Sequence, residues 1–334
     1  MGAALKNIVQ EFAKPHRIDD LSGIVAIDAF NTLYQFLTII RQPDGTPLMD
    51  ADGRVTSHLS GIFYRTISML EAGLQPVFIF DGKPPDLKQA TNEKRRAQRD
   101  EAEQKLQEAQ RVGDTEAAYK YARAAARPDE AIIQSAKDLL TAMNIPYLTA
   151  PSEGEAQAAY MVTKGDVTYA ASQDYDTLLF GAPTFLRNLT VSGKRKFRGR
   201  TINVQPEIVH LKDVLSGLAL THEELIQVAI LTGTDFNPGV PGIGAKKGLK
   251  AVKSGEFQKT LEQASQTDID YDEIMEFFLH PPTTNEYELR FKSPNSDLIS
   301  AFLCDNYGFS EEKILHTLKK VTNTGEQKSL DQWF

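Results

Sequence analysis

The chain has 334 residues, of which 41% are hydrophobic, enough for a sizeable core in one large or two ordinary domains. No apolar run approaches the roughly 20 residues needed to cross a bilayer, and the single cysteine, Cys304, excludes an internal disulfide. Because no apolar signal stretch opens the sequence, we expect an intracellular, cytoplasmic globular protein without membrane attachment.

The charges are unevenly distributed along the chain. A net charge of -8, from 37 basic and 45 acidic residues, argues on its own against a nucleic-acid-binding protein. Basic residues nevertheless gather in three segments that contain few acids, at residues 88–99, 187–200 and 246–253. These segments predict three basic patches, which override the acidic net charge.

Apolar, β-rich runs at residues 23–27, 76–80 and 167–171 alternate with helical patterns such as 31–41 and 56–72. This alternation predicts an α/β fold with a central, mostly parallel sheet flanked by helices. Residues 134–143 are amphipathic, and we expect Ser152 to cap a helix that carries Glu153 and Glu155 in its first turn.

An insertion at about residues 83–130 has a composition that favours helices with little burial. It is either a solvated helical hairpin or an arch whose basic base leans over a site. From residue 211 onward the sequence is mostly helical, with a helical hairpin at about 222–255. We therefore expect one domain over residues 1–321 and a flexible tail over 322–334.

Seven carboxylates stand at the ends of apolar runs or at a helix start: Asp28, Asp81, Glu153, Glu155, Asp174, Asp176 and Asp235. In an open α/β sheet, residues at the carboxyl ends of strands converge on one crevice. Like charges in one crevice repel each other unless cations neutralise them, so the pattern predicts a divalent-metal site.

The metal that suits this set is magnesium. Mg²⁺ prefers oxygen ligands, whereas six histidines and one cysteine with no ligand spacing disfavour zinc. If the strand pairing continued, Asp174 and Asp176 would face the same side of the sheet. The alternatives are an ordinary aspartate turn at 174–176 and, for Glu153 and Glu155, a simple complement to the helix dipole.

The segment GVPGIGAKK at 239–247 predicts a phosphate site. Gly239, Gly242 and Gly244 expose backbone N–H groups at a helix start, and Lys246 and Lys247 follow. The alternative is an ordinary glycine turn. No strand precedes the segment and no Walker loop is completed, which disfavours an NTPase.

The last eight residues, QKSLDQWF, place Leu330, Trp333 and Phe334 about one helical turn apart after a polar stretch. Apolar side chains so spaced predict docking into a groove of a partner protein. The alternative is a terminus that folds back onto its own core.

Six segments in order along nearly the whole chain resemble those of the flap endonucleases, the structure-specific 5′ nucleases of replication and repair. They are IDAFNTLYQF, TSHLSGIFYRT, FIFDGKPPDLK, APSEGEAQAAY, ASQDYDTLLFG and LTGTDFNPGVPGIGAKK. The resemblance implies a Mg²⁺-dependent hydrolase that cuts branched DNA with a 5′ flap near the single-strand junction, with 5′–3′ exonuclease activity. It also implies that the seven carboxylates surround two Mg²⁺, for which Mn²⁺ would substitute.

The resemblance assigns further roles. Lys88 and Arg95 would contact the scissile phosphate, and Tyr34 would stack on a base, although Tyr34 also falls on an apolar helical face typical of a core. Arg41 and Gln42 open a region that resembles the wedge that splits the duplex junction. The glycine hairpin resembles the family's duplex-gripping motif, which also holds K⁺.

The terminal segment resembles the sliding-clamp box, with Gln327, Leu330, Trp333 and Phe334 in its positions. This implies the sliding clamp, PCNA, as a partner of a monomeric enzyme, and the lack of a long basic tail resembles archaeal members. Two alternatives stay open: a related 5′ nuclease that acts on bubbles or four-way junctions, and a non-catalytic scaffold that binds DNA and the clamp.

Overall fold

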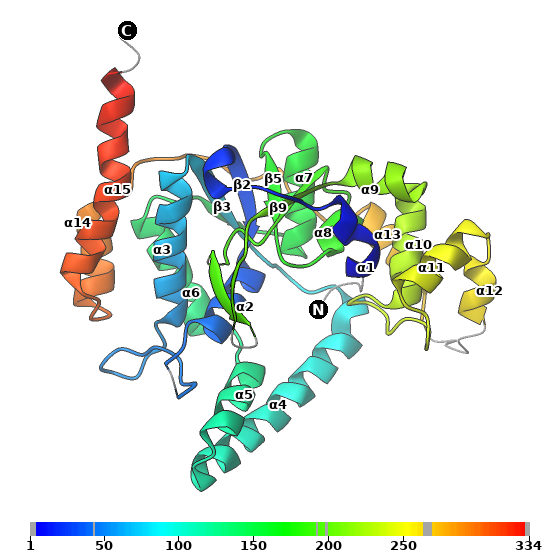
Figure 1. The fold of residues 1–334 in the computed structure, drawn as a ribbon, viewed down its shortest axis with the longest axis horizontal. Coiled ribbons are helices and arrows are strands. Elements are labelled where there is room, and N and C mark those ends of the chain that lie inside the picture. The colour runs from blue at the N-terminus through cyan, green and yellow to red at the C-terminus, as the bar shows by residue number, and fades with distance from the viewer. Residues whose placement is uncertain (1–4, 43, 192, 198–199, 263–268, 331–334) are drawn as a thin grey trace.

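A central sheet of seven strands, in the order β1-β9-β6-β5-β2-β3-β4, lies between two layers of helices (Figure 1). The computed structural model describes residues 5–42, 44–191, 193–197, 200–262 and 269–330, and within 194–202 and 322–330 it describes the backbone alone. The strands of the sheet are β1 (Lys14–Pro15), β2 (Gly23–Asp28), β3 (Leu74–Phe80), β4 (Tyr147–Thr149), β5 (Tyr169–Ala171), β6 (Thr184–Arg187) and β9 (Glu207–His210).

The sheet is mostly parallel, which confirms the prediction from the sequence. Strands β2, β3, β4, β5 and β6 pair in parallel, whereas β9 pairs antiparallel with β6 and with β1. A separate antiparallel hairpin is formed by β7 (Lys194–Phe197) and β8 (Arg200–Asn203).

The central strands are buried on both faces, which explains why their sequences are continuous apolar runs. On β3, Val77 and Ile79 enter one core, and Phe78 and Phe80 enter the other. The first core is covered by α1 (Lys6–Val9), α7 (Gly154–Lys164), α8 (Asp176–Leu179), α9 (Leu211–Leu218), α10 (His222–Thr232), α11 (Ala245–Lys253), α12 (Phe257–Glu262) and α13 (Tyr271–Leu279). The second is covered by α2 (Ala29–Ile39), α3 (Ser57–Glu71), α6 (Glu130–Ala142), α14 (Ser296–Ser300) and α15 (Glu311–Leu330).

The predicted insertion is helical. Helices α4 (Gln89–Val112) and α5 (Thr115–Ala125) pair and extend from the body as an arm, hereafter the arch (Figure 1). Gly113, in the left-handed region at φ 75°, ends α4, and the Asp114 side chain caps α5. The residues that these two helices bury are alanines, Ala102, Ala109 and Ala118, so the arch has only a thin apolar seam.

The C-terminal helix α15 continues through Leu330, so it includes residues 322–330 of the predicted tail. Ile314 and Leu318 anchor the start of α15 in the second core. Trp333 and Phe334 of the predicted clamp box lie outside the described residues.

Within the described residues, no single helix is long and apolar enough to cross a membrane, and one bent pair, Leu211–Leu218 with His222–Thr232, passes that test by length and composition.

Candidate active site

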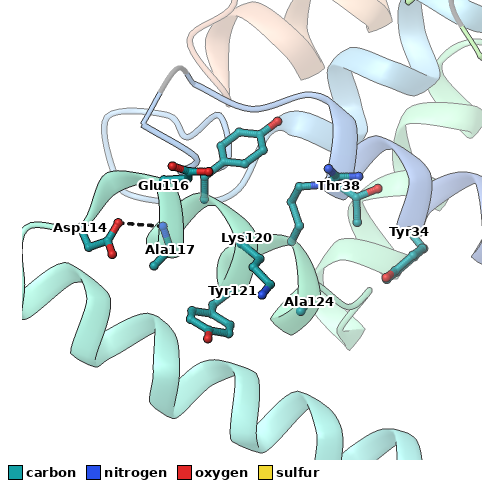
Figure 2. Close-up of a pocket in the computed structure, with 10 residues that line it drawn as sticks. Tyr34, Thr38, Asp114, Glu116, Ala117, Lys120, Tyr121 and Ala124 are labelled. Carbon is teal, nitrogen blue, oxygen red and sulfur yellow. Dashed lines mark hydrogen bonds between the residues drawn. The ribbon is translucent and has the colours of Figure 1, made fainter. Parts of the chain in front are cut away.

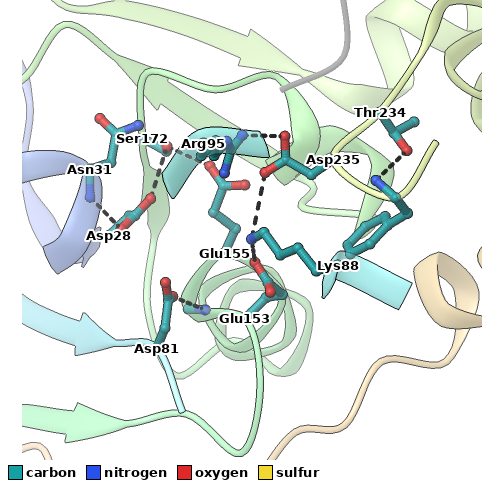
Figure 3. Close-up of polar contacts among 12 residues, drawn as sticks. Asp28, Asn31, Asp81, Lys88, Arg95, Glu153, Glu155, Ser172, Thr234 and Asp235 are labelled. Atoms are coloured by element: carbon teal, nitrogen blue, oxygen red, sulfur yellow. Dashed lines mark hydrogen bonds and ion pairs between the residues drawn. The ribbon is translucent and has the colours of Figure 1, made fainter. Parts of the chain in front are cut away.

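The sheet and its neighbouring loops bring the seven predicted carboxylates to one site. Asp28 ends β2, Asp81 follows β3, and Glu153 and Glu155 flank the start of α7. Asp174 and Asp176 follow β5, and Asp235 follows α10. Figure 3 shows five of them, Asp28, Asp81, Glu153, Glu155 and Asp235, around one space into which Lys88 and Arg95 also reach.

The carboxylates are close enough to raise one another's pKa. Burial, and then repulsion from Asp81, raises the pKa of Asp28 to about 8, with Asp174 and Glu153 contributing. Burial and then Glu153 raise the pKa of Asp81 to about 6. Burial, followed by repulsion from Asp28, Asp174 and Asp176, raises the pKa of Glu155 well above its ordinary value. The site therefore holds more acid groups than it keeps ionised at neutral pH without added positive charge.

Asp81 also caps helix α7. The prediction that Ser152 caps this helix is wrong, because Glu153 is the N-cap and the Ser152 hydroxyl is buried without a hydrogen-bond partner among the described residues. The Gly154 N–H instead donates to Asp81 Oδ1 at 2.7 Å. A carboxylate is favourable at the positive end of a helix, and here the neighbouring strand supplies it.

Ser172 and Thr177 position Glu155, and the sequence analysis did not single them out. Ser172 Oγ donates to Glu155 Oε1 at 2.5 Å and lies 3.3 Å from Asp28 Oδ2. Thr177 Oγ1 lies 3.2 Å from the same Glu155 oxygen. The signal that could have found Ser172 is its place directly after the apolar run of β5, where the acids of the other strands also stand.

The Asp174-Tyr175-Asp176 segment is a turn followed by the first residue of α8, so the argument from strand alternation is wrong. Arg187 holds this turn: its Nη1 donates to Tyr175 Oη at 2.7 Å, and its guanidinium carbon lies 4.4 Å from the centre of the Tyr175 ring. Arg187 also pairs with Glu207 at 3.2 Å. Because its side chain is only 13% exposed, Arg187 does not belong to the predicted surface patch.

Lys88 and Arg95 lie at the base of the arch and enter the acidic site. Lys88 Nζ is 2.5 Å from Glu153 Oε2 and 3.5 Å from Asp235 Oδ2, and Arg95 Nη2 is 2.6 Å from Asp235 Oδ1. Burial disfavours the Lys88 ammonium, but attraction to Glu153 and Asp235 outweighs it and raises the pKa of Lys88. The two cations therefore fasten the arch base to the carboxylates.

The donor set suits a divalent cation that prefers oxygen. As the side chains stand in the described ranges, no three His, Cys, Asp or Glu form a group that could hold a metal ion. Glu153 and Asp235 are drawn to Lys88, and Glu155 is drawn to Ser172. Burial and mutual repulsion nevertheless raise the pKa values of Asp28 and Asp81, and a divalent cation bound at these oxygens would favour their ionised forms.

Tyr34 is 48% exposed, so the alternative of a core position is wrong for this residue, although Leu33 and Leu37 beside it are buried. Tyr34 and Thr38 form one wall of an open pocket of about 750 Å³, and helix α5 of the arch forms the other (Figure 2). The pocket also exposes Tyr121 and Lys120. An exposed aromatic ring beside basic groups is suited to stacking on a base.

The predicted DNA-binding residues fall into two regions. Arg41 and Gln42 follow α2, and Arg41 already donates to three backbone carbonyls. Gly239 and Gly242 adopt positive φ angles of 74° and 79° between α10 and α11, and Gly244 is the N-cap of α11. Lys246 and Lys247 occupy the first turn of α11, where Lys247 Nζ donates to the Gly242 carbonyl at 2.9 Å.

Comparisons with known proteins agree with this geometry. The family model described as the XPG N-terminal domain matches residues 1–102, and the XPG I-region matches residues 144–235. The chain is 56% identical to flap endonuclease 1 of Methanoregula boonei over the full length of both, and 54% identical to that of Pyrococcus abyssi, covering 100% of this chain and 98% of the relative. It also resembles the solved flap endonuclease-1 from Methanococcus jannaschii, with 41% identity, a TM-score of 0.75, and 95% and 97% of the two chains covered.

Proposed function

Because the chain belongs to the flap endonuclease 1 family, it is a structure-specific nuclease of DNA replication and repair, and we propose that it cuts 5′ flaps by hydrolysis with two Mg²⁺. The observation that carries the proposal is the single site in which Asp28, Asp81 and Glu155 have raised pKa values beside Lys88 and Arg95. Metal ions of this kind lower the pKa of a water and stabilise charge on a reacting phosphate.

The protein groups have separate roles in this proposal. The seven carboxylates would hold the cations, with Ser172 and Arg187 orienting Glu155 and the 174–176 turn. Lys88 and Arg95 would bind the scissile phosphate, because positive donors aimed at developing phosphate charge stabilise the transition state. Exposed Tyr34 would stack on a base next to the cut.

The duplex would lie against the hairpin between α10 and α11. Backbone N–H groups at the start of α11 and the side chains of Lys246 and Lys247 would bind phosphates of any sequence. A K⁺ ion would bind among the hairpin carbonyls. Because such contacts release counterions, we propose that DNA affinity falls steeply with rising salt.

Replacement of Asp174 tests the metal role. We expect Asp174→Ala to bind a labelled 5′-flap substrate with nearly unchanged affinity in Ca²⁺ or EDTA, and to lose cleavage in Mg²⁺, because a cation ligand is removed without touching the DNA-binding surfaces. Asp138→Ala, which removes an acid on the outer face of α6, serves as the matched control. Undiminished cleavage by Asp174→Ala would refute the metal assignment.

A substrate panel tests which branched DNA is cut. Labelled flap, gapped, bubble, nicked and four-way-junction DNA of matched sequence are incubated with Mg²⁺, with an EDTA control. We expect cleavage of the 5′ flap near the junction to dominate, with slower 5′–3′ removal of nucleotides from nicks. Preferential cutting of bubbles or junctions would favour the related nuclease activities instead, and no cleavage of any substrate would favour a scaffold.

The C-terminal segment is proposed to bind the sliding clamp through Gln327, Leu330, Trp333 and Phe334. The support is the spacing of the apolar residues in the sequence. Deletion of residues 327–334 should abolish clamp binding in a surface plasmon resonance titration and leave flap cleavage without the clamp unchanged. Equal clamp affinity with and without the segment would exclude it as the main contact.

A further inference from the structure

Arg41 is tied to three segments that are separate in the fold. Its Nε donates to the Leu37 carbonyl at 2.7 Å, its Nη1 to the Gly45 carbonyl at 2.7 Å, and its Nη2 to the Ala122 carbonyl at 2.9 Å. Leu37 and Ala122 lie in the last turns of α2 and α5, where a helix leaves backbone carbonyls without N–H donors of its own. A half-buried guanidinium between the negative ends of two helices is favourable electrostatically.

A second contact lies beside the first. Gly45 has a positive φ of 88°, and a Cβ built on it would lie 2.6 Å from Tyr119 Cα of helix α5. The loop after α2 therefore packs directly against the backbone of the arch, at a distance that only glycine permits. Arg41 and Gly45 together join this loop to α5, at Ala122 and at Tyr119.

Among the described elements, α5 packs mainly against α4 and more weakly against α2. The fully buried residues of α4 and α5 are three alanines, which bury little side-chain area. At the other end of the arch, Lys88 and Arg95 hold its base through ion pairs with Glu153 and Asp235. Lys88 and Arg95 therefore attach one end of the arch to the body, and Arg41 attaches the other end, which leads into α6.

We propose that Arg41 is a positioning residue that fixes helix α5 above α2, rather than a group that contacts a DNA phosphate. By holding α5, it sets the width of the pocket between Tyr34 on α2 and Tyr121 on α5 (Figure 2). The consequence for flap cutting rests on the proposed function, whereas the tie itself is a property of the free protein. An experiment on the free protein can therefore disprove the contact between Arg41 and α5 without any bearing on the nuclease assignment.

Amide hydrogen exchange of the DNA-free protein tests the tie. We expect Arg41→Met to raise exchange in residues 115–125 by about tenfold, the order expected for loss of one charge-assisted hydrogen bond, and to leave α3 unchanged. The exchange rate of residues 115–125 in Arg41→Lys should lie between those of the unaltered protein and Arg41→Met, because an ammonium does not match a planar guanidinium that donates to three carbonyls. The charge-matched control is Arg17→Met, an exposed arginine paired with Asp19, which should leave α5 protected.

Gly45→Ala provides an independent variant, because it pushes the loop away from Tyr119 while Arg41 is retained. We expect it to raise exchange in α5 in the same direction. Unchanged α5 exchange in both Arg41→Met and Gly45→Ala would overturn the proposal. So would an α5 segment that already exchanges at the unprotected rate in the unaltered protein.

DNA binding separates positioning from phosphate contact. If Arg41 binds a phosphate, Arg41→Met should lower the slope of log affinity against log salt by about one contact. We expect that slope to stay the same, and we expect kcat to fall several-fold on a long 5′ flap but little on a nicked duplex without a flap, with KM nearly constant. A reduced salt slope together with unchanged α5 exchange would refute the positioning role.

Discussion

Lys88 lies between Glu153 and Asp235, two of the proposed metal ligands, so its removal should strengthen metal binding if the proposed site is correct. Its ammonium is 2.5 Å from Glu153 and 3.5 Å from Asp235, and all three side chains are only 13% exposed. Attraction to Glu153 and Asp235 outweighs burial and raises the pKa of Lys88, which favours the charged ammonium. A metal ion that draws Glu153 or Asp235 must displace this contact.

The size of the effect follows from the bond that is displaced. A hydrogen bond to a charged group contributes about 1.5–3 kcal/mol, and each 1.4 kcal/mol is a factor of ten in affinity. We therefore expect Lys88→Met to bind Mg²⁺ or Mn²⁺ roughly ten- to one-hundredfold more tightly. In the same variant, cleavage should fall by about 10²–10³ because the phosphate loses a positive donor. Metal affinity should therefore rise while the cleavage rate falls.

Isothermal titration calorimetry with the DNA-free protein measures the metal affinity without any dependence on catalysis. Lys83→Met is the control, since it removes an exposed lysine from the same segment and changes the net charge equally. Unchanged or weaker metal binding by Lys88→Met would refute the competition. Equal tightening in Lys83→Met would show a general charge effect instead.

Three further predictions concern the fold around the site. Burial lowers the pKa of His58 to about 4, below the ordinary 6.5. Between pH 6.5 and pH 4 the unfolded chain therefore binds a proton at His58 that the folded chain does not bind. The free energy of unfolding should fall by up to about 3 kcal/mol as the pH is lowered through this range. His58→Gln should lack this loss, and a difference in urea stability between the two proteins that stays constant over this window would contradict it. Gly82→Ala places a Cβ 2.0 Å from the Ala150 carbonyl, which should destabilise the protein by about 1–3 kcal/mol, and an unchanged Tm would disprove that approach. Tyr175→Phe removes the hydroxyl that accepts a hydrogen bond from Arg187. Metal affinity measured by calorimetry should weaken about tenfold, with little change in Tm. A metal affinity equal to that of the unaltered protein would exclude a role for Tyr175 and Arg187 in holding the turn.

The sheet and the acidic site follow from local sequence because their signals are local. Strands β2 and β3 are buried on both faces, so each is a continuous apolar run, and the acid after each run stands at the carboxyl end of its strand. Parallel strand ends meet at one edge, which is why Asp28 and Asp81 could be placed together before any coordinates.

Other features depend on contacts between distant segments, and sequence reasoning missed them. Ser152 has the residue type of a helix cap, but Asp81 from 73 residues away reaches the Gly154 N–H instead. Arg187 resembles a member of a basic surface patch, yet it packs over Tyr175. Tyr34 follows the apolar spacing of a core helix, and only the position of the arch shows that its face of α2 is open.

The hydrogen bond from the Gly154 N–H to Asp81 has a practical consequence for anyone who wants an inactive enzyme that still grips its substrate. Asp81→Ala would uncap the helix that presents Glu153 and Glu155, so a lost activity would mix chemistry with local unravelling. Asparagine at this position keeps an oxygen that can accept the same bond while losing the charge. Trapping experiments are therefore better built on Asp81→Asn than on alanine.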